Sequence, residues 1–130
     1  MPNRGLNSYR QTQVQSRTPL ELVVMLYDGT LQSLSKARAA IERRDIPARR
    51  DALSRALAII SELQLTLNLE QGGAVAASLD QLYTYCSLRL LDATMKNDVG
   101  PLDEVGRLLS TLRDAWRTIA APVAAADTAA

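Results

Sequence analysis

The sequence predicts an all-α protein, an antiparallel up-down-up-down four-helix bundle with an N-terminal arm. Composition is the first reason, because Phe is absent and β-branched residues are sparse, whereas Ala, Leu and Arg are abundant. Periodicity is the second, because apolar residues recur at helical spacing in four segments. The third is that the breaks between these segments are short, as they are between neighbouring antiparallel helices.

We expect one bundle domain over residues 18–121, a normal domain size for a chain of 130 residues that is 47% hydrophobic. Residues 1–17 are mostly polar, with Tyr9 and Val14 among their few sizeable apolar side chains. This segment is predicted to be a flexible arm, which Tyr9 and Val14 would pin against the bundle. The Ala-rich residues 122–130 are predicted to form a disordered tail.

The first helix begins at Thr18-Pro19 and is predicted to run to about Arg44. Thr18 is a favourable N-cap, Pro19 suits the first helical position, and Glu21 completes a Thr-x-x-Glu capping box. One stripe of this helix is apolar and is predicted to face the core. Its members are Leu20, Val23, Val24, Tyr27, Leu31, Leu34 and Ile41.

The same helix has a second apolar face that its core stripe does not explain. Leu22, Met25 and Leu26, with Gly29 one turn on, lie roughly opposite the stripe. One interpretation is that further helices or a loop cover this face. The other is that it forms a groove for another chain, because a monomer seldom exposes a large contiguous apolar patch.

Asp45-Ile46-Pro47 ends the first helix, and a second is predicted from Pro47 to Glu70. Gly72-Gly73 is predicted to form the next turn, since glycine readily adopts the left-handed conformation that stops a helix. The second helix has an apolar stripe for the core, with Ile59 broadening it on one side. The stripe contains Leu53, Ala56, Leu57, Ile60, Leu63 and Leu67.

The third and fourth helices are predicted over Ala74 to Asn97 and Pro101 to Ala121. The third has a core stripe and, on its far side, the apolar residues Leu88, Leu91 and Met95. The fourth has a single apolar band. The residues expected in the core are Val75, Leu79, Leu82, Tyr83, Cys86, Leu90 and Ala93 from the third helix and Leu102, Val105, Leu109, Leu112, Trp116 and Ile119 from the fourth.

The amino-acid composition argues against several classes of function. The chain has no His, so His-based metal sites, general bases and catalytic triads are unavailable, and we expect neither an enzyme nor a cofactor. A small helical mutase would need inward Arg and Glu side chains, and we find no Arg at a predicted core position of the second or fourth helix. The single Cys86 is interpreted as a core residue rather than a reactive thiol. No apolar run approaches the ~20 residues that span a bilayer, so we expect a cytoplasmic protein without membrane insertion or signal peptide.

Charge is concentrated in one segment. The chain carries a net charge of +1, yet Lys36 to Arg55 holds seven basic and three acidic residues. A basic patch suits phosphate or an acidic partner, whereas a solvated turn between two helices is the simpler interpretation. No aromatic residues interleave with these charges, so single-stranded nucleic acid is not expected as a partner.

An ordered set of motifs, running from Tyr9 to Trp116, resembles the FliS family of flagellin-specific export chaperones. The motifs are the arm led by Tyr9, Thr18-Pro19-x-x-Leu22-x-x-Met25-Leu26-Tyr27-Asp28-Gly29, Ile59-Ile60-x-Glu62-Leu63-x-x-x-Leu67-Asn68, Leu82-Tyr83-x-Tyr85, Arg89-Leu90, Ala93-x-x-Lys96-Asn97-Asp98 and Arg113-x-Ala115-Trp116. Two features depart from the family: Cys86, where members often have Met, and the tail after Pro122.

The resemblance implies a four-helix bundle with an N-terminal cap that binds the disordered C-terminal segment of flagellin, prevents its premature polymerisation and delivers it to the flagellar type III export apparatus. A component of the export gate is the second partner implied. An arm that covers the groove when it is empty would keep the free protein from aggregating. The candidate flagellin-binding residues are Tyr9, Leu22, Met25, Leu26, Tyr27, Ile59, Leu63, Leu88, Leu91 and Met95.

A rival interpretation from another class remains. The second apolar faces would instead form the seam of a homo-oligomeric structural bundle, or of an adaptor without chaperone activity. A homodimer of the free protein fits either interpretation. Size-exclusion chromatography with light scattering, with and without flagellin, separates them.

Overall fold

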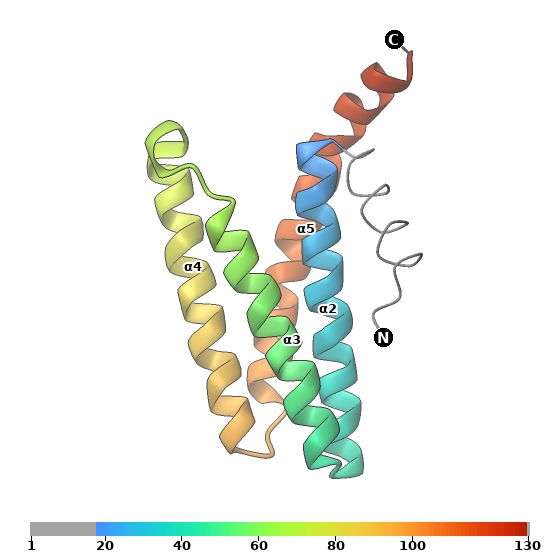
Figure 1. Cartoon of the computed structure of the whole chain (residues 1–130), viewed down its shortest axis with the longest axis vertical. Helices are drawn as coiled ribbons and strands as arrows, with labels where there is room; N and C mark the ends of the chain where they lie inside the picture. Colours follow the sequence, from blue (N-terminus) through green and yellow to red (C-terminus); the bar gives the residue numbers. More distant parts are fainter. Residues whose placement is uncertain (1–17, 130) are drawn as a thin grey trace, which may run out of the picture.

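The computed structural model describes residues 18–129, with side chains for residues 18–121. It contains α2 (Pro19–Arg43), α3 (Ile46–Leu65), α4 (Leu69–Met95) and α5 (Gly100–Ala129), and no strand falls within the described range. Consecutive helices run in opposite directions (Figure 1). Helix α2 packs on α3 and α5, and α4 packs on the same two helices, so the four form a closed square. The predicted all-α bundle is confirmed.

The start of α2 is built as the sequence predicts. The Thr18 hydroxyl accepts a hydrogen bond from the Glu21 amide at 3.2 Å, and the Thr18 amide donates to the Glu21 carboxylate at 3.2 Å. These two bonds satisfy amides that the first turn of a helix leaves without partners. The helix ends at Arg43, and the left-handed φ of 57° at the C-cap residue Arg44 turns the chain toward α3.

The end of α3 was predicted wrongly. The helix stops at Leu65 instead of Glu70, because Thr66 ends it and Asn68 begins the next one. The Thr66 hydroxyl donates to the Leu63 carbonyl at 2.7 Å, and the Asn68 side chain accepts from the Gln71 amide at 3.0 Å. Asn is a strong N-cap and a weak helix former, so local capping outweighs the apolar pattern through Leu67.

The two glycines also act differently from the prediction, because they lie inside α4 and do not form the turn before it. Gly73 has φ 55° and ψ −131°, which bends the helix after its first turn. Gly72 lies so close to Ala76 that a Cβ on it would be 2.6 Å from the Ala76 Cβ. The beginning of α4 is therefore a short helical turn set at an angle to the rest.

The core follows the predicted stripes over most of their length. Between α2 and α3 the buried residues are small, with Ala37, Ala40, Ala52 and Ala56 all inaccessible or nearly so, which allows a close approach of the two helices. The large fully buried side chains complete the core. They are Tyr27, Leu53, Ile60, Leu63, Tyr83, Leu90, Val105 and Leu109.

Three residues contradict the core prediction. Val75 is 70% exposed and Ile119 is also exposed, although both lie in predicted core stripes. Arg49 is buried in α3, where no core Arg was expected; its guanidinium donates to the Asn97 side chain at 2.9 Å and to the Thr94 carbonyl at 3.3 Å. Arg49 thus ties α3 to the connection between α4 and α5. Helix α5 is longer than predicted, and the disordered tail over 122–130 stays a prediction.

Candidate binding surfaces

The second apolar face of α2 is partly covered by α3. Leu26 packs against the core, and a Cβ added to Gly29 would lie 3.3 Å from the Ile59 Cδ1 atom. Leu22 is half-buried and Met25 remains 37% exposed. The interpretation that a neighbouring helix covers this face therefore holds for Leu26 and Gly29, and only Leu22 and Met25 are left for another chain.

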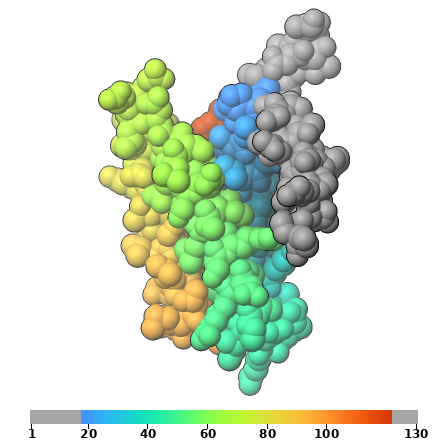
Figure 2. Space-filling model, viewed as in Figure 1, coloured from blue at the N-terminus to red at the C-terminus, as the bar shows by residue number. Residues whose placement is uncertain are grey.

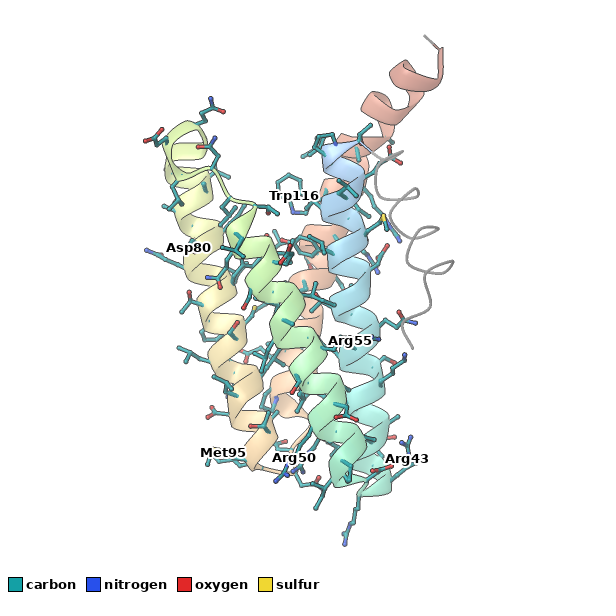
Figure 3. All side chains as sticks on the ribbon, in the orientation of Figure 1. Arg43, Arg50, Arg55, Asp80, Met95 and Trp116 are labelled. Carbon is teal, nitrogen blue, oxygen red and sulfur yellow. The ribbon has the colours of Figure 1, made fainter. Side chains whose placement is uncertain are left out.

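The outer face of α4 is apolar and uncovered by the described residues. Leu88, Leu91 and Met95 are 60%, 47% and 85% exposed. Their spacing of three and four residues places them in one stripe along the helix. Figure 3 places Met95 at the end of α4. These three residues, here called the α4 stripe, are the predicted candidates that the structure brings together on the surface.

Two predicted candidates lie inside the core and cannot contact a partner directly in this structure. Tyr27 is fully buried and Leu63 is 1% exposed, while Ile59 is half-buried between α2 and α3. The Tyr27 and Tyr83 hydroxyls lie 2.6 Å apart, and burial raises the pKa of both phenols. Tyr27 and Leu63 therefore support the bundle from within. Tyr9 lies outside the described residues.

A pocket that the sequence did not predict lies at the end of the bundle where α2 begins. It measures about 240 Å³, and half-buried Trp116 lies against it. The Trp116 Nε1 atom is buried and makes no hydrogen bond of standard length and angle to a described residue, although its interaction with the Tyr27 hydroxyl partly offsets the rise in the pKa of that phenol that burial causes. In Figure 3 the Trp116 ring lies between the beginnings of α4 and α2. The side chains around the pocket are mainly apolar and include Leu20, Val23, Leu67, Val75, Leu79 and Tyr83.

This pocket continues into a groove of about 410 Å³ between α4 and α5, and the two share Val75 and Leu79. Leu82 from α4 and Leu112 from α5 lie farther along the groove. The space-filling view shows a notch between the start of α4 and the start of α2, with α5 visible at its base (Figure 2). We call the pocket and the groove together the open end.

The open end arises because apolar side chains remain where two helices diverge. Val75, Leu79 and Leu112 occupy predicted core stripes, yet α4 bends at Gly73 and Val75 is left exposed. The apolar period identifies the inward face of a helix but says nothing about how near its neighbour comes. The Gly72-Gly73 pair, interpreted only as a turn, was the one signal that could have indicated the bend.

Polar chemistry at these surfaces is limited. Asp28 forms ion pairs with Arg113 at 3.4 Å and Arg117 at 3.3 Å, which join α2 to α5 beside Met25. Burial raises the pKa of the Cys86 thiol to about 11, so the thiol is protonated near neutral pH. Within residues 18–121 no group of three or more acidic or Cys side chains is arranged to hold a metal ion. None of the described helices is long and apolar enough to cross a membrane.

The fold and these surfaces define a class of protein: an antiparallel four-helix bundle that leaves apolar side chains uncovered on one helix and at one end. Comparison with known proteins identifies the family. The family model for the flagellar protein FliS matches residues 2–123, and the chain belongs to this family. The resemblance inferred from the motifs is confirmed.

Curated relatives match over most of their own length. The flagellar secretion chaperone FliS of Salmonella typhimurium is 39% identical over 120 residues, covering 88% of this chain and 89% of the relative. FliSB of Pseudomonas aeruginosa is 37% identical over 117 residues, covering 87% and 93%. FliS of Bacillus subtilis is 40% identical over 110 residues, covering 85% and 81%.

Proposed function

We propose that this protein is a cytoplasmic export chaperone that binds the disordered C-terminal segment of flagellin, prevents premature polymerisation and delivers it to the flagellar export apparatus. Membership of the FliS family and the names of its relatives, flagellar secretion chaperones, support the export role. A chaperone of this kind binds its partner and performs no reaction on it. An export-gate component is the second partner we propose.

The observation that carries the proposal is the amount of apolar surface left uncovered by the described residues. The α4 stripe and the open end both involve α4 but lie on opposite faces of it, so one ligand reaches both only if it wraps around this helix. A disordered segment loses conformational entropy when it binds, so a useful affinity requires a long interface. Unbranched Met95 and the Leu side chains around it adapt to different ligand shapes, which suits a partner that folds on binding.

The flagellin-binding surface we propose therefore differs in part from the residues selected in the sequence. Leu88, Leu91, Met95 and Met25 are retained because each is exposed, and half-buried Leu22 is retained because it does not pack against the core cluster. Tyr27, Leu63, Ile59 and Leu26 are assigned to the support of the surface. The residues added at the open end are Val75, Leu79, Leu82, Leu112 and Trp116.

Paired substitutions on the α4 stripe test this proposal. Leu88→Ser with Met95→Ser should weaken capture of intact flagellin by about 30-fold, the size of one interface hot spot, while the helicity of the protein is unchanged. Ile46→Ser is the matched control, because Ile46 is an exposed apolar residue at the start of α3, outside the proposed surface. Calorimetry with intact flagellin and with flagellin lacking its C-terminal segment gives the affinities.

Two results would reject the proposal. Capture that is unaffected by removing the flagellin C-terminus would show that another segment is bound. Equal losses in the double variant and in Ile46→Ser would show that the α4 stripe is not the site. The homo-oligomeric alternative predicts a stable oligomer that flagellin does not dissociate, which light scattering of the same samples detects.

A further inference from the structure

A second groove, between the outer faces of α2 and α3, has a composition unlike that of the open end. It measures about 560 Å³, and three cationic side chains lie along it: Lys36 and Arg43 from α2 and Arg55 from α3. Asp51 is the only carboxylate in its lining. In Figure 3, Arg43, Arg50 and Arg55 all lie on the α2–α3 hairpin. Three of the seven basic residues in the segment noted in the sequence thus lie along one groove.

The positive charge in this groove is not neutralised by the described part of the protein. No ion pair within 4.0 Å joins Lys36 or Arg55 to a described carboxylate, and Arg43 has only an exposed pair with Asp45 at 3.6 Å. Arg38, only two residues from Lys36, shows the contrast, because its guanidinium donates to Asp103 at 3.0 Å. Exposed pairs contribute little to stability, so the three groove cations have no strong structural role.

The other side chains that line the groove are small, apart from Asp51. Ser33 and Ala39 from α2 and Ala48, Ala52 and Ser54 from α3 line it between the cations. Small residues at a helix surface allow the backbone of another helix to approach closely. The long side chains of Lys36, Arg43 and Arg55 then carry charged ends that can reach acidic groups on a helix inserted in the groove.

We propose that this groove binds an acidic helix of a protein partner, at a site separate from the flagellin surface. Its lining shares no residue with the α4 stripe or the open end, and none with Leu22 and Met25, which lie near the start of α2 whereas Lys36 and Arg43 lie toward its end. An acidic helix supplies both the complementary charge and a rod that fits between two helices. The two partners therefore bind at the same time.

Other anionic partners fit the groove less well. A duplex or single strand gains affinity from many phosphate contacts, and single strands also stack on aromatic rings, whereas this groove has three cations, one carboxylate and no aromatic residue. A membrane surface is too flat to enter a groove between two helices. The groove has few charges and several small side chains, and this combination favours a protein helix as the partner.

Fluorescence anisotropy with a labelled peptide tests the proposal. The probe is an amphipathic Ala/Glu peptide of about 18 residues, long enough to span the groove as a helix, and the reference probe has Gln in place of every Glu. The full-length protein should bind the Glu peptide at least tenfold more tightly than the Gln peptide at about 0.1 M salt. Lys36→Glu with Arg55→Glu should remove that preference.

The matched control is Lys96→Glu with Arg107→Glu, which changes the net charge equally at two exposed residues outside the groove. This control should retain the preference within about threefold, since general attraction between net charges is screened by salt over ~10 Å. Ala39→Trp fills the groove and keeps every charge, so it should also weaken the binding of the Glu peptide.

Three outcomes would overturn the inference. Equal losses of Glu-peptide affinity in the groove variant and the charge control would show that the peptide responds only to the net charge of the protein. Glu-peptide binding that Ala39→Trp does not change would place the peptide elsewhere. Binding of a single-stranded oligonucleotide or a phosphatidylserine vesicle that depends on Lys36 and Arg55, with no binding of the Glu peptide, would assign the groove to another class of partner. Calorimetry with flagellin on the groove variant should give unchanged affinity, so a failure here and a failure of the proposed function are distinguishable.

Discussion

At the end of the bundle where α2 joins α3 and α4 joins α5, the apolar side chains that face the core are fully enclosed. At the other end, side chains that face the core line a pocket. Leu53, Leu90 and Val105 are 0% exposed near the first end, whereas Trp116 and Leu79 near the second are only partly buried. We call the first the closed end. Both ends use the same four helices, so the difference comes from how the helices are tied together.

Short, hydrogen-bonded connections hold the closed end. Arg44 and Asp45 join α2 to α3, and the Asp45 side chain caps α3 by accepting from the Ala48 amide at 3.1 Å. Buried Arg49 bonds to Asn97 and to the Thr94 carbonyl, which fixes the second connection against α3. At the open end one connection, Thr66 to Asn68, leads into the bend at Gly73. A bundle therefore encloses its core only where its connections bring all four helices together.

The largest expected effect compares one large side chain from each end. Leu53→Ala should lower the free energy of unfolding by about 3 kcal/mol, because it leaves a cavity in a fully enclosed site. Trp116→Ala removes more atoms but should cost only about 2 kcal/mol, since one side of the ring already lies against a pocket. Urea denaturation of both variants measures the two losses.

The sequence predicted Trp116 as a core residue, and a deeply buried aromatic side chain would give a larger loss of about 3–5 kcal/mol. A loss in Trp116→Ala equal to or larger than that in Leu53→Ala would show that the two ends are equally well packed. The open end would then be as well packed as the closed end, and its residues would lose their place in the proposed flagellin surface. A smaller loss combined with weaker flagellin capture would assign Trp116 to the surface.

A smaller effect is expected at the bend that separates the two ends. Gly73→Ala should cost about 1–2 kcal/mol, because a φ of 55° with a ψ of −131° is open to glycine and strained for alanine. The cost is conformational, since nothing lies within 4 Å of the position a Cβ would occupy. Thermal or urea denaturation gives the change in stability.

Gly106 provides the matched control for this substitution. It lies in α5 without a positive φ, and a Cβ there would also meet nothing within 4 Å. Gly106→Ala should stabilise the protein by about 0.5–1 kcal/mol, through higher helix propensity and a less flexible unfolded chain. Stabilisation by both substitutions would mean that the bend at Gly73 is not required in the folded protein.

The parts of the molecule that could be predicted from sequence are those determined by residues close together in the chain. The capping box at Thr18, the starts of α2 and α5 and the core positions of Leu53 and Leu90 depend on residues within one or two turns of each other, and all are confirmed. Val75 and Ile119 were predicted wrongly because their exposure depends on the position of a different helix. Periodicity carries no information about that distance.

The candidate site divides in the same way. The α4 stripe was visible because Leu88, Leu91 and Met95 lie opposite a complete core stripe on one helix. The pocket beside Trp116 could not be predicted in this way. Its lining residues satisfy the core pattern and are left uncovered because α4 bends at Gly73. Arg49 was missed for the opposite reason: a charged residue enters a core only when distant partners, here Asn97 and Thr94, accept its hydrogen bonds.

The smallest expected effect is a pH dependence of stability that originates in the polar contacts of the closed end. The Arg38 guanidinium, which donates to Asp103 at 3.0 Å and 3.2 Å, lowers the pKa of that carboxyl. Hydrogen bonds from the Tyr85 hydroxyl and from Arg89, both at 2.6 Å, lower the pKa of Glu104. Each contact joins α5 to a neighbouring helix near the closed end.

A carboxyl whose pKa is lower in the folded than in the unfolded protein stabilises the fold in its ionised form. The unfolded values are about 3.9 for Asp and 4.3 for Glu, so the contribution is complete near neutral pH and declines as the pH falls from about 5 through the folded pKa values. Because all five side chains are partly exposed, solvent and salt reduce the contribution. Urea midpoints measured between pH 7 and pH 3 should fall toward acid, and Asp103→Asn with Glu104→Gln should lower the midpoint at pH 7 and reduce the acid-dependent fall. An identical pH profile in this double variant would show that these contacts do not hold the closed end, and that apolar packing and the Arg49 hydrogen bonds alone distinguish it from the open end.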